Sequence, residues 1–180
     1  ASSRWTLALA AVVMLDHLMG FFTYSRGFRG GGFNGVIDPQ LTELGGFKPE
    51  YLNSYEVGFK TIAFDQRASF NVSFFYGDYT DIQVTTQREI ESESGVNIGQ
   101  ETTNAAKATQ KGVEIETLLN LVEGLRIEGS VGILHTNYDE FAAFSDLTGD
   151  PISRAGESFR NAPELQTHIA IQYSFPVPLE

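Results

Sequence analysis

The sequence contains no cysteine among its 180 residues. Disulfide bonds, thiolate zinc sites and cysteine nucleophiles are therefore excluded. Basic residues are also scarce: 12 Lys and Arg stand against 23 Asp and Glu, which gives a formal net charge of −11. Because phosphate binding needs clustered Lys and Arg, this balance argues against a nucleic-acid partner. A membrane-spanning helix needs about 20 apolar residues, and the apolar stretch at residues 5–15 is too short for one.

The composition is that of a folded chain, because 42% of the residues are hydrophobic and 12% are aromatic. Five segments alternate apolar and polar residues with a period of two: 54–60, 67–77, 112–117, 125–133 and 168–175. Successive side chains of a strand point to opposite faces, so this alternation predicts β-strands. No helical stripe competes with it. The sequence therefore predicts an all-β, antiparallel protein.

Short and long connections alternate along the chain. Tight turns are predicted at 65–66, 120–124 and 176–178, and at 16–17 if the segment before it is a strand. Long polar segments are predicted at 29–50, about 81–108 and 139–160. In an up-and-down sheet all the tight turns then lie at one end, which is the pattern of transmembrane β-barrels. The predicted strands of about 12–15 residues also exceed the 5–6 residues usual in soluble sheets.

The aromatic and charged residues fit a barrel wall. Aromatic residues gather near the predicted strand ends, as an interfacial girdle requires: Tyr51, Tyr55, Phe64, Tyr76, Tyr79, Tyr138, Phe141, Tyr173 and Phe175. Six charged residues fall on the face opposite the apolar one, where they would line a lumen or face a plug: Glu56, Lys60, Glu114, Glu116, Arg126 and Glu128. A soluble β-sandwich shows the same alternation, because periodicity does not say which face is buried.

Residues 1–15 form a segment of their own, separate from residues 16–180. The apolar run "WTLALAAVVML" has the length of a transmembrane strand, which needs about 9–11 residues. It also has the length of a signal-peptide core, although "HLMG" is a poor cleavage site. A buried helix or a sequence artefact is the third interpretation, and the sequence leaves all three open.

Five phrases, in this order, resemble the barrel portion of the TonB-dependent outer-membrane receptors. They are "YSRGFRGGGFN" (24–34), "KPEYLNSYEVGFK" (48–60), "FFYGDYTDIQV" (74–84), "NAAKATQKGVEIE" (104–116) and "PISRAGESFRNAPELQTHIAIQYSF" (151–175). The resemblance covers about residues 18–175, and residues 1–15 match poorly. Complete receptors of this family resemble a barrel of about 22 strands with a plugged lumen. Six to seven strands fit here and no plug domain is seen, so the chain is expected to be a fragment of an up-and-down transmembrane β-barrel.

The resemblance implies a function in transport and no enzymatic activity. The expected role is the barrel portion of an active transporter in the bacterial outer membrane, energised through TonB, for a scarce nutrient such as a ferric siderophore. The implied partners are outer-membrane lipid, the plug domain with the TonB system, and a small metal chelate. No cofactor or nucleic acid is expected. Heme, cobalamin and oligosaccharide also stay open as ligands, and the alternatives are a passive porin-type channel or a soluble β-sandwich binding module.

The run "GFRGGGFN" at 27–34 is the most distinctive short stretch. A phosphate-binding loop needs a following helix, which is not predicted here. We interpret the run as a strand end that turns sharply into a loop, with glycine permitting a positive φ. The candidate ligand-mouth residues are Arg26, Arg29, Gly30, Gly31, Gly32, Phe33 and Asn34. The sequence predicts neither a metal site nor a catalytic group, because its three histidines, His17, His135 and His168, are widely separated.

Overall fold

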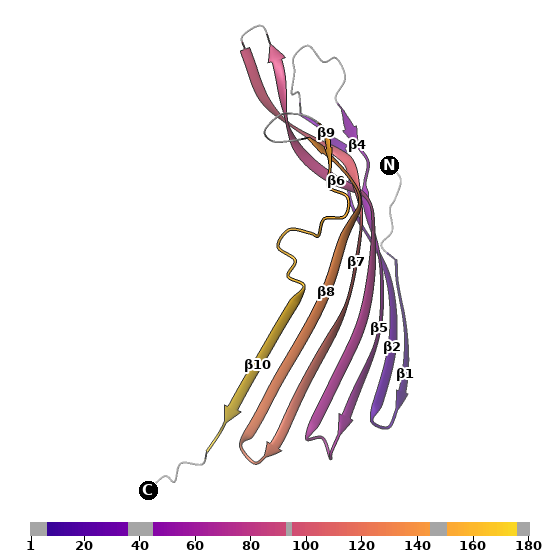
Figure 1. Ribbon diagram of the computed structural model, residues 1–180. Coiled ribbons are helices and arrows are strands. Elements are labelled where there is room, and N and C mark those ends of the chain that lie inside the picture. The colour runs from indigo at the N-terminus through magenta and orange to yellow at the C-terminus, as the bar shows by residue number, and fades with distance from the viewer. Residues whose placement is uncertain (1–6, 36–44, 93–94, 145–150, 176–180) are drawn as a thin grey trace.

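The computed structural model describes residues 7–35, 45–92, 95–144 and 151–175 (Figure 1). Seven main strands form one antiparallel sheet in the order β1-β2-β5-β6-β7-β8-β10. Their bounds are β1 Leu7–Leu15, β2 Leu18–Arg29, β5 Glu50–Ala63, β6 Ala68–Ser92, β7 Gly95–Val122, β8 Leu125–Phe144 and β10 Leu165–Tyr173. Three short strands complete the set: β3 Gly32–Phe33 pairs with β4 Gly46–Phe47, and β9 Pro151–Ser153 pairs with β8. Among the described residues no helix is long and apolar enough to cross a membrane.

The predicted order of short and long connections is confirmed from β1 to β10. The turn predicted at 176–178 lies outside the described residues. Tight turns join β1 to β2 at residues 16–17, β5 to β6 at 64–67 and β7 to β8 at 123–124. Figure 1 shows these turns together at one end of the sheet, with the long connections at the other. One long connection differs from the prediction. The segment 81–108 is for the most part a hairpin, because β6 and β7 continue past a register shift near Ile82 to Ser92 and Gly95.

Residues 7–15 of the N-terminal apolar run form a strand, β1. β1 pairs with β2 from Leu7↔Arg26 to Leu15↔Leu18. Residues 1–6 lie outside the described part of the chain, so the structure bears only on the second half of the segment 1–15.

Residues directly opposite each other in an antiparallel ladder share a face of the sheet. One unbroken row across six strands is entirely apolar: Phe22, Val57, Phe74, Val113, Ile133 and Leu165. We call the side that carries this row the apolar face, and the opposite side, which carries Glu56, Glu114 and Glu116, the polar face. The alternation read from the sequence is therefore present in three dimensions.

No second layer of the described residues covers the apolar face. Ile169 is 76% exposed and Ile171 is 69% exposed, and even in mid-sheet Phe74 is 45% exposed. The only hydrophobic residues buried among those described are Ala68, Ala106 and Ala108. A β-sandwich would bury this face against another sheet, and the described residues supply no such sheet.

Aromatic residues border the apolar face at two heights. Tyr24, Tyr55 and Tyr76 form one row toward the loop end, with ring centroids 5.0 and 6.4 Å apart. Tyr173 stacks on Phe175 at the turn end. On β8, His135 is in register with Tyr76, and Leu125 is opposite Tyr173. These two positions are about ten residues apart, or roughly 26 Å in height for a strand tilted by 40°. That height is close to the apolar band of about 25 Å that barrels present to lipid. Three predicted girdle residues lie elsewhere, because Tyr79, Tyr138 and Phe141 are on the polar face.

The β5–β6 turn contains three successive non-glycine residues with positive φ: Phe64 (54°), Asp65 (53°) and Gln66 (68°). A left-handed conformation costs about 1–2 kcal/mol for a residue with a Cβ atom, and glycine avoids this penalty. Gln66→Gly is therefore expected to raise the free energy of unfolding by about 1 kcal/mol. A urea titration of the protein folded in detergent micelles measures the change.

The matched control is Glu123→Gly in the β7–β8 turn. Glu123 is not among the described residues with positive φ, so the same loss of a side chain relieves no strain there. We expect the control to leave the stability unchanged or to lower it. Equal stabilisation by both variants would show that the φ of Gln66 is not the cause.

Candidate functional site

The glycine run lies where β2 ends and the β3–β4 hairpin begins. None of Gly30, Gly31 and Gly32 has a positive φ, so the prediction that glycine serves a left-handed turn here is wrong. The reason is space. A Cβ atom on Gly31 would overlap the carbonyl oxygen of Phe47, and one on Gly32 would lie 2.8 Å from the Phe47 ring. These two glycines let β4 pack directly over β3, whereas Gly30 has open space around it.

The two candidate arginines lie on opposite faces. Arg26 is opposite Leu7 and Asn53 on the apolar face, and its guanidinium carbon is 4.7 Å from the centre of the Tyr51 ring. Arg29 is opposite Glu50, on the polar face at the loop end of β2, and is exposed. Of the two arginines, only Arg29 therefore lies at the loop end of the polar face, close in sequence to Phe33, which is 76% exposed.

Asn34 ties the glycine run to the β6–β7 hairpin. Its side-chain nitrogen donates to the Thr102 carbonyl (2.9 Å), and the Thr102 N–H donates to its side-chain oxygen (2.8 Å). The Asn34 side chain thus gives the Thr102 backbone one donor and one acceptor, as the backbone of a neighbouring strand would. Asn34 is only 9% exposed, and its backbone N–H donates to Gly45. Its amide thus holds the loop in place, with both polar groups already bonded within the protein.

Two further amides complete this attachment. Asn104 accepts from the Lys48 N–H (2.6 Å) and donates to the carbonyl oxygens of Lys48 (2.8 Å) and Asp81 (2.7 Å). Gln83 donates to the carbonyl oxygens of Gly30 (2.8 Å) and Lys48 (3.1 Å). We call Asn34, Gln83 and Asn104 the amide clasp. Sequence reasoning missed Gln83 and Asn104, because nothing in a polar loop marks which amides reach across the fold.

The segment 154–164, which connects β9 to β10, packs over the polar face from the β8 side. The backbone of this segment bonds to the edge of β8, through Leu134 N–H to Glu164 (2.9 Å) and Tyr138 N–H to Glu157 (2.9 Å). The Phe159 N–H donates to the hydroxyl of Thr136 (2.9 Å), which is 4% exposed. The Phe159 ring lies 4.9 Å from Tyr138 and 6.0 Å from Tyr79, between ring centroids. This contact explains why these two tyrosines are not girdle residues.

The register puts all six charged residues predicted for the lumen on the polar face: Glu56, Lys60, Glu114, Glu116, Arg126 and Glu128. Arg126 and Glu128 form an ion pair (2.6 Å), and Asn71 donates to the Glu116 carboxylate (3.3 Å). The Lys60 ammonium lies 5.7 Å from the centre of the Phe21 ring. Four carboxylates against two cations give this surface a net negative charge.

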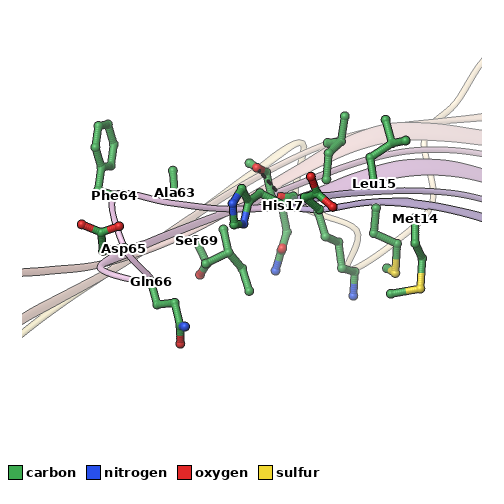
Figure 2. Close-up of a pocket in the computed structure, with 15 residues that line it drawn as sticks. Met14, Leu15, His17, Ala63, Phe64, Asp65, Gln66 and Ser69 are labelled. Carbon is green, nitrogen blue, oxygen red and sulfur yellow. Dashed lines mark hydrogen bonds between the residues drawn. The ribbon is translucent and has the colours of Figure 1, made fainter.

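Among the hollows lined by described residues, three lie along the sheet. One of 310 Å³ lies between Glu116, Glu128 and His168, and one of 170 Å³ lies beside Glu56 and Glu114. The third, of 980 Å³, lies at the turn end (Figure 2). Residues of the β1–β2 and β5–β6 turns line it, among them His17, Phe64 and Gln66, far along the strands from the glycine run. Its lining mixes apolar and polar side chains, and the described polar groups there do not cluster as a ligand site would require.

The described residues contain no group of three His, Asp or Glu side chains placed to hold a metal ion. The three histidines are spread over the sheet. His17 is in the β1–β2 turn, His135 is on the apolar face of β8, and His168 is on the polar face of β10.

Three solved structures share the fold. The ferric yersiniabactin uptake receptor FyuA from Yersinia pestis matches with a TM-score of 0.61 and 17% identity, over 91% of this chain and 22% of the receptor. The alcaligin outer-membrane receptor FauA from Bordetella pertussis matches with a TM-score of 0.59 and 14% identity, over 98% and 27%. The siderophore receptor PirA from Acinetobacter baumannii matches with a TM-score of 0.59 and 13% identity, over 96% and 27%. This chain therefore spans about a quarter of the length of these structures.

The family match is more extensive than the sequence phrases indicated. Residues 1–178 match the family described as TonB dependent receptor-like, beta-barrel. The match includes residues 1–15, which the five phrases did not cover. The open, antiparallel sheet with its tight turns at one end is what a portion of such a barrel requires. The chain belongs to the TonB-dependent receptor family, within its β-barrel domain.

Proposed function

We propose that this chain is part of the barrel wall of an outer-membrane receptor that imports a ferric siderophore with energy supplied through TonB. The observation that carries the proposal is the family match over residues 1–178 on a sheet whose two faces differ in polarity. The similar structures are named as receptors for ferric yersiniabactin, for alcaligin and for a siderophore, which favours this ligand class over heme, cobalamin or oligosaccharide.

The two faces suit two different surroundings. The apolar face presents exposed Phe, Ile and Val side chains between two aromatic borders, as lipid contact requires. A Lys or Arg at the bilayer midplane is unfavourable by about 2–4 kcal/mol. Charged residues such as Glu56, Lys60 and Glu114 belong in a wet lumen for that reason. In the complete receptor we expect some of these carboxylates to contact the plug domain.

The ligand mouth is proposed at the loop end of the polar face. Arg29 supplies an exposed positive charge there, and Phe33 supplies an exposed aromatic ring. Gly31, Gly32 and Asn34 act by fixing the position of this corner rather than by touching the ligand. A loop held in its bound form loses less conformational entropy when ligand binds. The barrel contributes binding and a pathway, with no covalent chemistry.

Uptake of a radiolabelled ferric siderophore tests the function. The complete receptor that carries this sequence is expressed in a bacterium deprived of its own siderophore receptors, and a panel of ferric catecholates and hydroxamates is offered. We expect uptake of at least one of them, lost when TonB is deleted. Uptake that continues without TonB would indicate a passive porin-type channel instead.

The separation of the two arginines gives a paired test of the mouth. Arg29→Ala is expected to weaken siderophore binding by about tenfold, the effect of removing one charge-assisted contact. Arg26→Ala removes the same charge from the apolar face and is expected to leave the affinity within about twofold. Dissociation constants measured on the purified receptor by fluorescence quenching decide the matter. Equal losses in both variants would contradict the assignment.

The amide clasp is tested by hydrogen exchange at one amide. The Thr102 N–H donates to the Asn34 side-chain oxygen, so Asn34→Ala removes the acceptor and Asn34→Asp keeps it. We expect exchange at Thr102 to accelerate by about tenfold in the alanine variant, from the loss of roughly 1–2 kcal/mol. Exchange in the aspartate variant is expected to stay closer to that of the natural protein. Unchanged exchange in the alanine variant would mean that the clasp does not hold the loop.

A further inference from the structure

One row of the apolar face carries polar groups at the border of the lipid band. This row continues the tyrosine row across two more strands. From β2 to β8, each member lies opposite the next: Tyr24, Tyr55, Tyr76, Lys111 and His135. The next row toward the turns is the apolar row defined above. The next row toward the loops is polar and consists of Arg26, Asn53, Asp78, Thr109 and Asn137. The Lys111 row therefore marks the boundary between the apolar and polar parts of this face.

Lys111 is exposed at this boundary and makes no ion pair within the described part of the chain. Tyr76, on one side of it, is 43% exposed, and His135, on the other side, is also exposed. Asp78 is the nearest carboxylate by register, one row toward the loops, but no ion pair joins it to Lys111. A cation, a phenol and an imidazole thus stand side by side on neighbouring strands, within about 10 Å at the usual strand spacing.

We propose that Lys111, with His135 and Tyr76 beside it, binds the phosphate of an anionic lipid headgroup in the outer leaflet. The inference rests on the proposed function, because that function sets the apolar face against lipid. Long cationic side chains at the edge of an apolar band direct their charge to the headgroup level. Ammonium, phenol and imidazole N–H groups all donate hydrogen bonds to phosphate oxygens. The acyl chains of the same lipid would lie along Phe74, Val113 and Ile133 below the site, of which Phe74 and Ile133 are exposed.

Lys107 offers a matched control on the same strand. Its ammonium is paired with Glu140 (2.8 Å), and the pKa of Lys107 is raised first by this hydrogen bond and then by the charge of Glu140. Lys107→Gln therefore removes the same charge as Lys111→Gln, but from a lysine that already has a partner within the protein.

Lipid retention by the complete receptor tests the site. The receptor is reconstituted with phosphatidylcholine and diphosphorylated lipid A, and retained lipid is counted by native mass spectrometry as lipid A is titrated. We expect Lys111→Gln to raise the apparent Kd for lipid A by about tenfold, and His135→Gln by a smaller factor. Lys107→Gln is expected to stay within about twofold of the natural protein.

Two outcomes would overturn the proposal. The first is equal lipid A retention by the Lys111→Gln and Lys107→Gln variants. The second is displacement of lipid A by inorganic phosphate alone, which would make the site one for free phosphate. Failure of the membrane assignment has a different signature, because the natural protein would then not insert into vesicles at all. Heat-dependent gel mobility shows that each variant is folded.

Discussion

The antiparallel backbone ladder is the constraint on which the rest of the structure depends. It runs through six strand pairs from β1 to β10 and fixes which residues stand opposite one another. A slip of one residue would turn every side chain of a strand to the other face. The apolar row that begins at Phe22 and the carboxylates that include Glu114 would then exchange surroundings. The proposed lumen charges and the proposed lipid boundary both depend on this register, because it decides which side chains share a face.

Strand positions within the lipid band were predictable because one face there is apolar and the other is polar. The turns at 65–66 and 120–124 were predictable for the same reason, since they interrupt the alternation. The upper part of the β6–β7 hairpin was not predicted. Polar residues interrupt both of its faces, as in Thr85↔Thr102 on one face and Val84↔Thr103 on the other, so no unbroken apolar alternation marks those residues as strands. The backbone hydrogen bonds of the ladder hold this part of the hairpin together, so it needs no apolar face from which its strands could be predicted.

The arrangement around the glycine run was predicted only in outline. The glycine run does lie at a strand end, but its conformation follows from the closeness of Phe47, which no local pattern reveals. The partners in the amide clasp are 53 to 68 residues apart where Gln83 meets Gly30 and Asn34 meets Thr102. Arg26 and Arg29 look equivalent in the sequence, yet three residues along a strand place them on opposite faces. Only the register distinguishes Arg26, which lies over Tyr51, from Arg29 at the loop end of the polar face.

The central claim is that the apolar face meets lipid and the polar face meets the aqueous lumen, and spin labelling along β7 tests it most directly. These 180 residues contain no cysteine, so single cysteines at 113, 114, 115 and 116 are introduced one at a time into a reconstituted receptor in which any cysteine outside these residues has been replaced. The account predicts that labels at 113 and 115 are relaxed by oxygen, which concentrates in lipid. Labels at 114 and 116 should instead be relaxed by a water-soluble nickel chelate. The same accessibility at all four positions, or the reverse alternation, would contradict it.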